Sequence, residues 1–344
     1  MKSRATLTDI AELAQVGVAT VDRVLNGRAP VRKDTADRVL KAAEELNYYA
    51  VPLMRQRAMP QLTNLRLGII LQKRADPLYQ NIAAALRQAF DLHPDVGGKL
   101  DIAFVDDISA QSLATKILEI GARCDALACV AIDHPLIVSA FERLHALGRP
   151  VFTLLSEVTA SSVTGYVGLD SRKLGRTGAY LVSSMAAPKG RIATLVGSHR
   201  YRGQELSEIG FRSYFRDTES EDRLLETIVN LDDPDVAGEV TKSLLDRHAN
   251  LAAIYDAGGG RDGIIRAIRE HPSGQRPMVV CNDLTPSTRL ALIDGIITCT
   301  LCLPVQTFGR VVVDEMIASV TGSRPVNPAS TLPFDIVFAE NLPT

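Results

Sequence analysis

The spacing of hydrophobic residues changes along the chain and divides it into a short head and a long body. In the head, apolar residues recur every three or four positions, which is typical of helices with one buried face. This spacing predicts helices over residues 7–14, 18–25 and 33–46. A tight turn separates the first two, and Asn26-Gly27 provides a left-handed stop for the second. Three short helices joined in this way indicate a helix-turn-helix unit.

In the body, short apolar runs alternate with amphipathic stretches. We predict strands at 65–71, 100–106, 126–132, 150–156, 191–197, 224–230, 251–257, 277–283 and 296–303, and helices at 78–91, 110–122, 135–147, 172–187, 204–217 and 304–321. Such alternation is typical of parallel sheets with helices on both faces. About ten strands in two series predict two lobes, with the chain crossing between them near residues 160–170. The predicted fold is a small all-α head on a two-lobed α/β body.

These patterns set the expected domain boundaries. Residues 1–48 form the helix-turn-helix head, 49–61 a hinge, and 62–344 the body. Within the body, lobe 1 takes about 62–160 together with 304–325, and lobe 2 takes about 161–303 together with the C-terminal segment.

Composition narrows the class of protein. Apolar content of 46% with 23% charged residues is ordinary for a globular protein. The chain contains no apolar run long enough for a membrane helix, and its start has no signal-like stretch, so we expect a cytoplasmic protein without a membrane partner. Five cysteines without regular spacing fit a reducing compartment. Cys299 and Cys302 lie in an apolar run that reads as a strand, where residues three apart face opposite sides, so we expect no metal site there.

Charge is distributed unevenly between head and body. Residues 1–60 hold ten Lys or Arg against seven Asp or Glu, and the rest of the chain holds 28 against 33. A basic end on an acidic body hints at a nucleic-acid contact confined to that end, with chance asymmetry as the alternative.

The second predicted helix has two distinct sides. Val21, Val24 and Leu25 lie on one side of the helical wheel, and polar residues occupy the other. In a helix-turn-helix unit this helix enters the major groove, where arginine can bond guanine and small apolar groups can touch a thymine methyl. A solvated three-helix cap is the alternative. The predicted base contacts are Arg23, Val18, Ala19 and Asp22, and the predicted phosphate contacts are Asn26, Arg28, Lys33 and Thr35.

The run TLTDIAELAQVGVATVDRVLNG, continuing through VRKDTADRVLKAAEELNY, resembles the head of the lactose-repressor (LacI/GalR) family of bacterial transcription regulators. The body resembles the periplasmic-binding-protein type 1 fold, which is the effector domain of that family. The resemblance implies a homodimer that binds a palindromic operator, with Thr6, Thr20 and Tyr48 as further DNA-contacting residues. It also implies that DNA affinity changes when a small molecule binds between the lobes. It implies neither a cofactor nor a metal.

The chain departs from the family pattern at several positions of the head and hinge. Gly17 and Asp22 stand where serine is usual in the family. We expect Gly17 to weaken the cap of the second helix, and Asp22 to restrict the range of operator sequences that the protein binds. Relatives often insert a hinge leucine into the minor groove, but Arg57 stands about where that leucine would be. Met54 or Leu53 is then the candidate wedge, with Arg57 entering the narrow groove.

Ligands of open α/β sheets bind at the carboxyl ends of strands, and this rule nominates the effector site. After the first strand, the segment QKRADPLY resembles the family's N-P-F-F segment, so a carboxylate there can accept from hydroxyls and a tyrosine can stack on a sugar ring. Many relatives carry a clamping arginine where this chain has Ser207, and two nearby residues are possible substitutes. The nominated residues are Lys73, Asp76, Tyr79, Ser156, Arg202, Gln204, Asp256, Arg261 and Asp283.

Each nominated side chain also has a purely structural interpretation. Tyr79 could be a core aromatic, and the aspartates could cap the helices that follow their strands. The leading hypothesis is a repressor of carbohydrate or polyol genes controlled by a small polyhydroxylated ligand. The alternatives are a sugar-processing α/β enzyme, for which no nucleophile and base pair stands out, and a transporter's solute-binding protein, which would require export.

Overall fold

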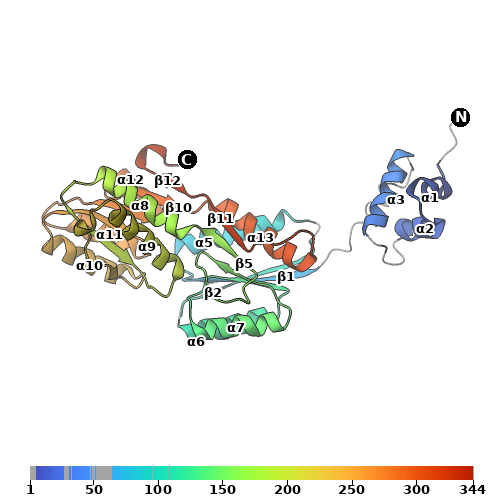
Figure 1. Ribbon diagram of the computed structural model, residues 1–344, viewed down its shortest axis with the longest axis horizontal. Helices are drawn as coiled ribbons and strands as arrows, with labels where there is room; N and C mark the ends of the chain where they lie inside the picture. Colours follow the sequence, from blue (N-terminus) through green and yellow to red (C-terminus); the bar gives the residue numbers. More distant parts are fainter. Residues whose placement is uncertain are drawn as a thin grey trace. The chain divides into compact units, whose positions relative to one another are not determined.

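The computed structural model describes residues 5–26, 31, 33–46, 48, 51, 64–94, 96–107 and 109–343 (Figure 1). The chain divides into two compact units, an N-terminal helical head and a larger α/β body, and each is described by itself.

The head consists of three helices, as the sequence predicts. They are α1 (Leu7–Ala14), α2 (Val18–Asn26) and α3 (Lys33–Glu45). Thr6 caps α1 in a reciprocal arrangement, because its main-chain N–H donates to the Asp9 carboxylate at 2.7 Å and its hydroxyl accepts from the Asp9 N–H at 3.3 Å. Small apolar side chains from all three helices form one core, with Ile10, Val21 and Val39 fully buried.

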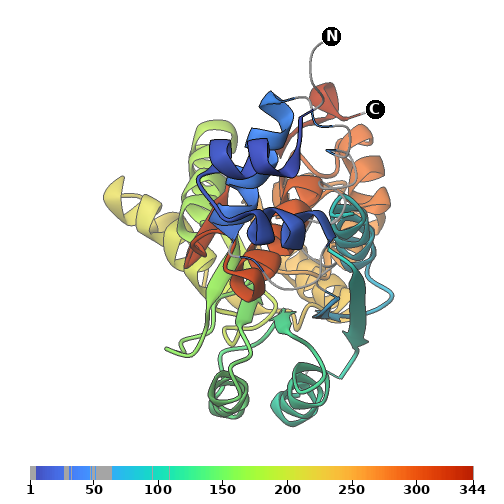
Figure 2. The ribbon, with the colours of Figure 1, turned by 90° about the vertical axis from the view of Figure 1, so that its right-hand side faces the viewer.

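The first sheet of the body has six strands, and five of them form consecutive parallel pairs from β11 to β1. Its strands follow the order β11-β5-β4-β3-β1-β2. They are β1 (Leu65–Gln72), β2 (Gly98–Val105), β3 (Ala126–Cys129), β4 (Val151–Leu154), β5 (Gly165–Leu169) and β11 (Ala329–Leu332). Helices α5 (Pro77–Asp91) and α13 (Val305–Thr321) pack together, while α6 (Ala110–Gly121) and α7 (Pro135–Ala146) lie side by side on another face, as both views show (Figures 1 and 2).

The second sheet repeats this plan in the order β12-β10-β9-β8-β6-β7, with β12 antiparallel to β10. Its strands are β6 (Arg191–Val196), β7 (Ile228–Val229), β8 (Leu251–Asp256), β9 (Met278–Asn282), β10 (Cys299–Cys302) and β12 (Asp335–Val337). One apolar cluster joins the strands to α10 (Pro234–Arg247), α11 (Arg261–Glu270) and α12 (Pro286–Ile293). A separate cluster joins them to α8 (Ser171–Met185) and α9 (Arg202–Asp217), so helices cover both faces.

The first crossing to the second sheet follows Leu169, inside the predicted range of residues 160–170. Because β5 pairs with β4, it belongs to lobe 1, although the predicted limit at about residue 160 places it in lobe 2. Lobe 1 also extends past residue 325, because β11 pairs with β5. The sequence showed neither strand, since β5 contains two glycines and β11 has an alternating, half-polar pattern.

The predicted strand at 224–230 is largely absent from the described chain. Glu221–Arg223 forms a short 3-10 helix, η1, Leu224 makes an isolated parallel bridge to Ile192, and Ile228–Val229 pairs with β6 as strand β7. β7 lies at an edge of the sheet and has one partner, so the apolar run alone does not extend the ladder. A second short 3-10 helix, η2 (Ala339–Asn341), follows β12.

A glycine sets the distance between α8 and α9. A Cβ atom on Gly175 would lie 1.8 Å from the main-chain oxygen of Ser207, so a larger side chain would force the two helices apart. Gly238 in α10 has ordinary clearance, with its nearest neighbours at 3.4 Å.

We therefore expect Gly175→Ala to lower the free energy of unfolding by about 1–3 kcal/mol, as overpacking of a close contact does. Gly238→Ala is the matched control and is expected to be neutral or slightly stabilising, because alanine favours helix by about 1 kcal/mol over glycine. Denaturant unfolding of both full-length variants measures the difference, and equal stabilities would contradict the close packing described.

Candidate functional site

The two sides of α2 differ as the sequence predicts. Val21 and Val24 are buried in the head, and Val18, Ala19 and Arg23 are exposed. Val18 keeps 44% of its surface exposed to solvent. The exposed side therefore offers a basic group beside small apolar groups.

An internal hydrogen bond orders the polar residues of α2. Asn26 Nδ2 donates to Asp22 Oδ1 at 2.7 Å, one helical turn apart, and both side chains are half-buried. One donor of Asn26 is thus already engaged, and Asp22 retains its second oxygen toward any base.

The other predicted DNA contacts are dispersed. Thr20 and Thr35 are half-buried on α2 and α3, and Thr6 caps α1. Tyr48 is 8% exposed and packs in the core of the head, away from the exposed side of α2. The predictions for Arg28, Arg57 and the two candidate wedge residues, Leu53 and Met54, fall outside the described residues. The same holds for the side chain of Lys33.

The body contains a cavity of about 160 Å³ between its two sheets. The carboxyl ends of strands from both sheets form its walls, as expected for open α/β sheets. Polar lining residues are Gln72, Lys73, Asp76, Tyr79, Ser156, Ser171 and Tyr201, with Gln204, Ser207, Asp232, Arg261, Asn282 and Asp283.

The cavity brings together seven of the nine nominated residues. Arg202 is not among its lining residues, and its Nε lies 3.6 Å from Glu157 Oε2 near the surface. Asp256 is fully buried behind the wall. Both were nominated from their place near a strand end, which does not determine the direction of a side chain.

Three hydrogen bonds connect the two lobes around the cavity. Lys73 Nζ donates to the main-chain oxygen of Asp232 at 2.7 Å, and Tyr201 Oη donates to Gln72 Oε1 at 2.6 Å. The N–H of Gly203 donates to Ser156 Oγ at 3.2 Å. The lobes are therefore held together by polar contacts that line the same space a ligand would occupy.

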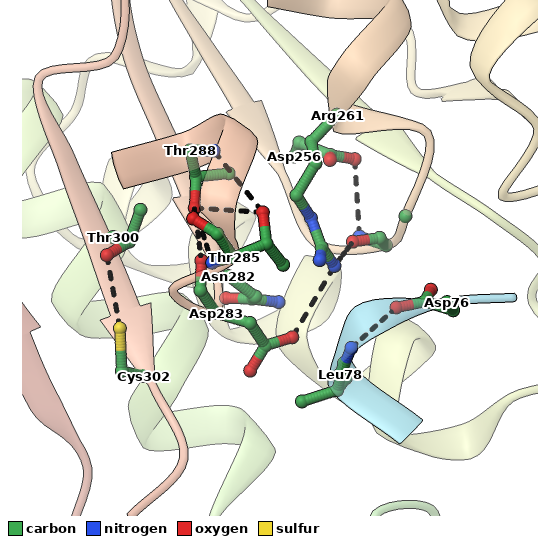
Figure 3. A network of polar contacts seen from close by, with 12 residues as sticks. Asp76, Leu78, Asp256, Arg261, Asn282, Asp283, Thr285, Thr288, Thr300 and Cys302 are labelled. Carbon is green, nitrogen blue, oxygen red and sulfur yellow. Dashed lines mark hydrogen bonds and ion pairs between the residues drawn. The ribbon is translucent and has the colours of Figure 1, made fainter. Parts of the chain in front are cut away.

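The guanidinium of Arg261 and the carboxylates of Asp256 and Asp283 form the polar centre of the second lobe (Figure 3). Arg261 Nη2 lies 3.4 Å from Asp283 Oδ2, and Asp76 from the first lobe faces the same region. Burial works against the charge of Arg261, but Asp283 and the other nearby carboxylates hold its pKa above the usual value. Burial raises the pKa of Asp256 to about 7, against the opposing effect of Arg261.

Gln204 is already fully engaged by the protein. Its Oε1 accepts from the N–H groups of Gly197 at 2.7 Å and Ser198 at 3.0 Å, and its Nε2 donates to Asp232 at 3.2 Å. It therefore orders the loops and does not substitute directly for a clamping arginine. Ser207, at the position of that arginine, is buried and bonds Tyr255 Oη at 2.7 Å.

Six polar residues of the cavity were not nominated from the sequence, namely Gln72, Ser171, Tyr201, Ser207, Asp232 and Asn282. Gln72 and Asn282 end strands β1 and β9, so the strand-end rule could have found them. Asp232 and Tyr201 lie in loops after strands β7 and β6, and no local pattern marks them.

None of the described helices has the length and apolar character that crossing a membrane requires.

Comparison with known proteins identifies both units. Residues 6–50 match the family model of bacterial regulatory proteins, lacI family, and residues 68–324 match that of a periplasmic binding protein domain. The chain is 26% identical to the ribose operon repressor of Halalkalibacterium halodurans over 261 residues, covering 73% of this chain and 70% of that one. Over 84 residues it is 34% identical to the transcriptional regulator GalR of Escherichia coli, covering 24% of each chain.

Solved structures share the fold of the body. A solute-binding protein of an ABC transporter from Burkholderia graminis, in complex with D-arabinose, superposes with a TM-score of 0.75 at 19% identity, covering 82% of this chain and 98% of that one.

The buried carboxyl of Asp256 makes a testable contribution to stability. Its folded pKa of about 7 lies above the ordinary value of 3.8, so its favourable contribution is present in acid and is lost as pH rises to about 7. We expect the stability advantage of Asp256→Asn over the native chain to grow by about 1–3 kcal/mol between pH 5 and pH 7 and to level off above. Denaturant unfolding across this range measures it, and parallel pH profiles would contradict the raised pKa.

Proposed function

Since this chain belongs to the lacI family of bacterial regulatory proteins and carries a periplasmic binding protein domain, we propose that it is a dimeric repressor of carbohydrate or polyol genes. Its operator affinity responds to a small polyhydroxylated ligand bound in the cavity of the body. The observation that carries this proposal is the cavity itself, whose polar walls come from the strand ends of both lobes. A protein that acts on the chromosome works in the cytoplasm.

Each head places α2 in the major groove of one half-site of a palindrome. Arg23 bonds a guanine edge, and Val18 and Ala19 contact thymine methyl groups. Asp22 accepts from a cytosine amino group through the oxygen that Asn26 leaves free. Residues near the start of α3, Lys33 and Thr35, bind phosphates and fix the orientation. Two heads in a dimer give the operator its two-fold symmetry.

The ligand acts through the contacts that join the lobes. A molecule in the cavity competes with or adds to the bridge between Lys73 and Asp232, and so changes the angle between lobes. In a dimer, that rotation changes the spacing of the two hinges and the fit to the operator. Couplings of this kind are typically about 1–3 kcal/mol, which is roughly a 5- to 150-fold change in affinity.

The ligand class is supported by the site and by relatives. Hydroxyl-rich molecules suit a cavity with many carboxylate, amide and hydroxyl groups. The names of the relatives point the same way, because one is a ribose operon repressor and one neighbour in fold holds D-arabinose. The head distinguishes this chain from solute-binding proteins of the same fold.

We expect Arg23→Ala to weaken binding to the operator about 10- to 100-fold and to relax the sequence preference at one position of each half-site, because a bidentate guanine contact contributes about 1–3 kcal/mol. In vitro selection from a random duplex library with the full chain first defines the operator. Gel retardation then compares the variants.

Lys41→Ala is the matched control, because Lys41 is exposed on α3 beyond its predicted phosphate contacts. It should weaken binding much less and leave the preferred sequence unchanged. If Arg23→Ala selects the same sequence with native affinity, α2 does not read bases through this residue.

We expect Lys73→Met to reduce the effect of ligand on operator affinity at least tenfold, because the bridge to Asp232 is lost. Lys116→Met is the control, since Lys116 pairs with Glu119 on α6 and does not line the cavity. Operator retardation is titrated with a compound that raises the melting temperature in a screen of sugars and polyols. If the ligand changes the operator affinity of Lys73→Met as much as that of the native chain, the bridge to Asp232 takes no part in the allosteric change.

A further inference from the structure

The charges that line the cavity do not balance. Three carboxylates, those of Asp76, Asp232 and Asp283, face two cations, those of Lys73 and Arg261. Asp256 stands behind the wall and adds further negative charge whenever it is ionised. The lining side chains therefore give the cavity an excess of negative charge.

Both cations are already engaged by the protein. The ammonium of Lys73 donates to the main-chain oxygen of Asp232 at 2.7 Å, and this bond also connects the lobes. The guanidinium of Arg261 faces Asp283 and the main-chain oxygen of Gly258, at 3.4 and 3.5 Å. An anionic ligand would have to compete with these partners and would sit beside three carboxylates.

Two polar atoms of lining residues have no hydrogen-bond partner, and one is an acceptor and the other a donor. Within residues 64–94, 96–107 and 109–343, the buried side-chain atoms without a partner are Asn282 Oδ1, Arg261 Nε, Asp256 Oδ2, Ser162 Oγ and Thr194 Oγ1, and the first two belong to residues that line the cavity. Arg261 is 8% exposed and lines the cavity, so its free Nε points to a ligand oxygen. Asn282 also lines the cavity and needs a donor from the ligand.

Tyr79 lies near the carboxylates of Asp76, Asp232 and Asp283. Its ring lines the cavity, and burial, followed by the nearby Tyr201, Asp232, Asp76 and Asp283, raises the pKa of its hydroxyl well above the usual value. An aromatic ring close to several carboxylates is a favourable surrounding for an organic ammonium, which gains both cation–π and ionic attraction.

We propose that the cavity selects a small polyol that carries a protonated amino group, such as an amino sugar or amino polyol, over neutral and acidic sugars. Its ammonium lies between Asp76, Asp283 and the ring of Tyr79, and its hydroxyls bond Arg261 Nε and Asn282 Oδ1. This inference rests on the proposed function only in taking the cavity as the effector site.

The test is a thermal-shift and calorimetric titration of the full chain with matched compounds. Each set holds one carbon skeleton in three forms: D-glucosamine, D-glucose and D-glucuronate, the corresponding galacto set, and 1-amino-1-deoxy-D-sorbitol with sorbitol and D-gluconate. We expect binding from the amine of at least one set, at least tenfold tighter than the hydroxyl form, and no measurable binding of the acids.

A charge-removing variant tests the same point from the protein side. Asp76 Oδ1 accepts from the Leu78 N–H at 2.9 Å and caps α5. Asparagine caps a helix equally well, so Asp76→Asn should keep native stability. We expect it to weaken the amine at least tenfold and the hydroxyl form much less. Asp233→Asn is the matched control, because exposed Asp233 caps α10 in the same way and does not line the cavity.

The outcomes separate this inference from the proposed function. Tighter binding of a neutral or acidic form, or equal losses of amine and hydroxyl binding in Asp76→Asn, overturns the inference and leaves a sugar-responsive repressor intact. No binding in any set counts against the inference and against a polyhydroxylated effector together. Operator selection by the native chain is measured separately and reports on the repressor alone.

Discussion

The hydrogen bond from Lys73 Nζ to the main-chain oxygen of Asp232 joins the two lobes where the polar ends of both sheets meet. The lobes also meet through Tyr201 with Gln72, through Gly203 with Ser156, through the Asp133 N–H with the Arg200 main-chain oxygen, and through the ion pair of Arg202 with Glu157. A contact set this small can be rearranged by one molecule, because each neutral hydrogen bond contributes only about 1 kcal/mol net. Ligand binding can therefore change the arrangement of the two lobes through the same hydrogen bonds that hold them together around the cavity.

Backbone conformation prepares the cavity before any ligand arrives. Lys73, Leu155, Asp232 and Asp283 all line it and all have left-handed backbone, with φ of 41, 62, 52 and 65°. Such conformations cost about 1 kcal/mol or more each for residues other than glycine and persist where surrounding contacts impose them. They follow the ends of strands β1, β4, β7 and β9, where the chain must turn sharply to enter the next helix or loop. The turns direct these side chains toward one space, so the site is largely preformed.

Several residues combine a structural role with a position in the cavity wall. Asp76 caps α5 with one oxygen and turns its charge to the cavity, and Gln204 orders three loop segments through its amide. The capping and ligand interpretations of Asp76, which compete in the sequence, are compatible in the structure. Gln204 shows the opposite case, since its contacts leave it no capacity for a ligand. The charge of the cavity follows from the same arrangement, because both cations are bonded to protein groups and the lining carboxylates outnumber them.

The sequence by itself determined the three head helices, the two sides of α2 and the alternation of strands and helices, because each depends on contacts within a few residues. It also nominated seven residues of the cavity wall, since parallel strands place their carboxyl ends at one edge. Only the tertiary structure decided the boundary at β5, the short β7 and the partners of Asp232, Gln204 and Arg202. Those depend on pairings between residues far apart in the chain, and no local pattern records which distant carbonyl, carboxylate or strand edge a given side chain will meet.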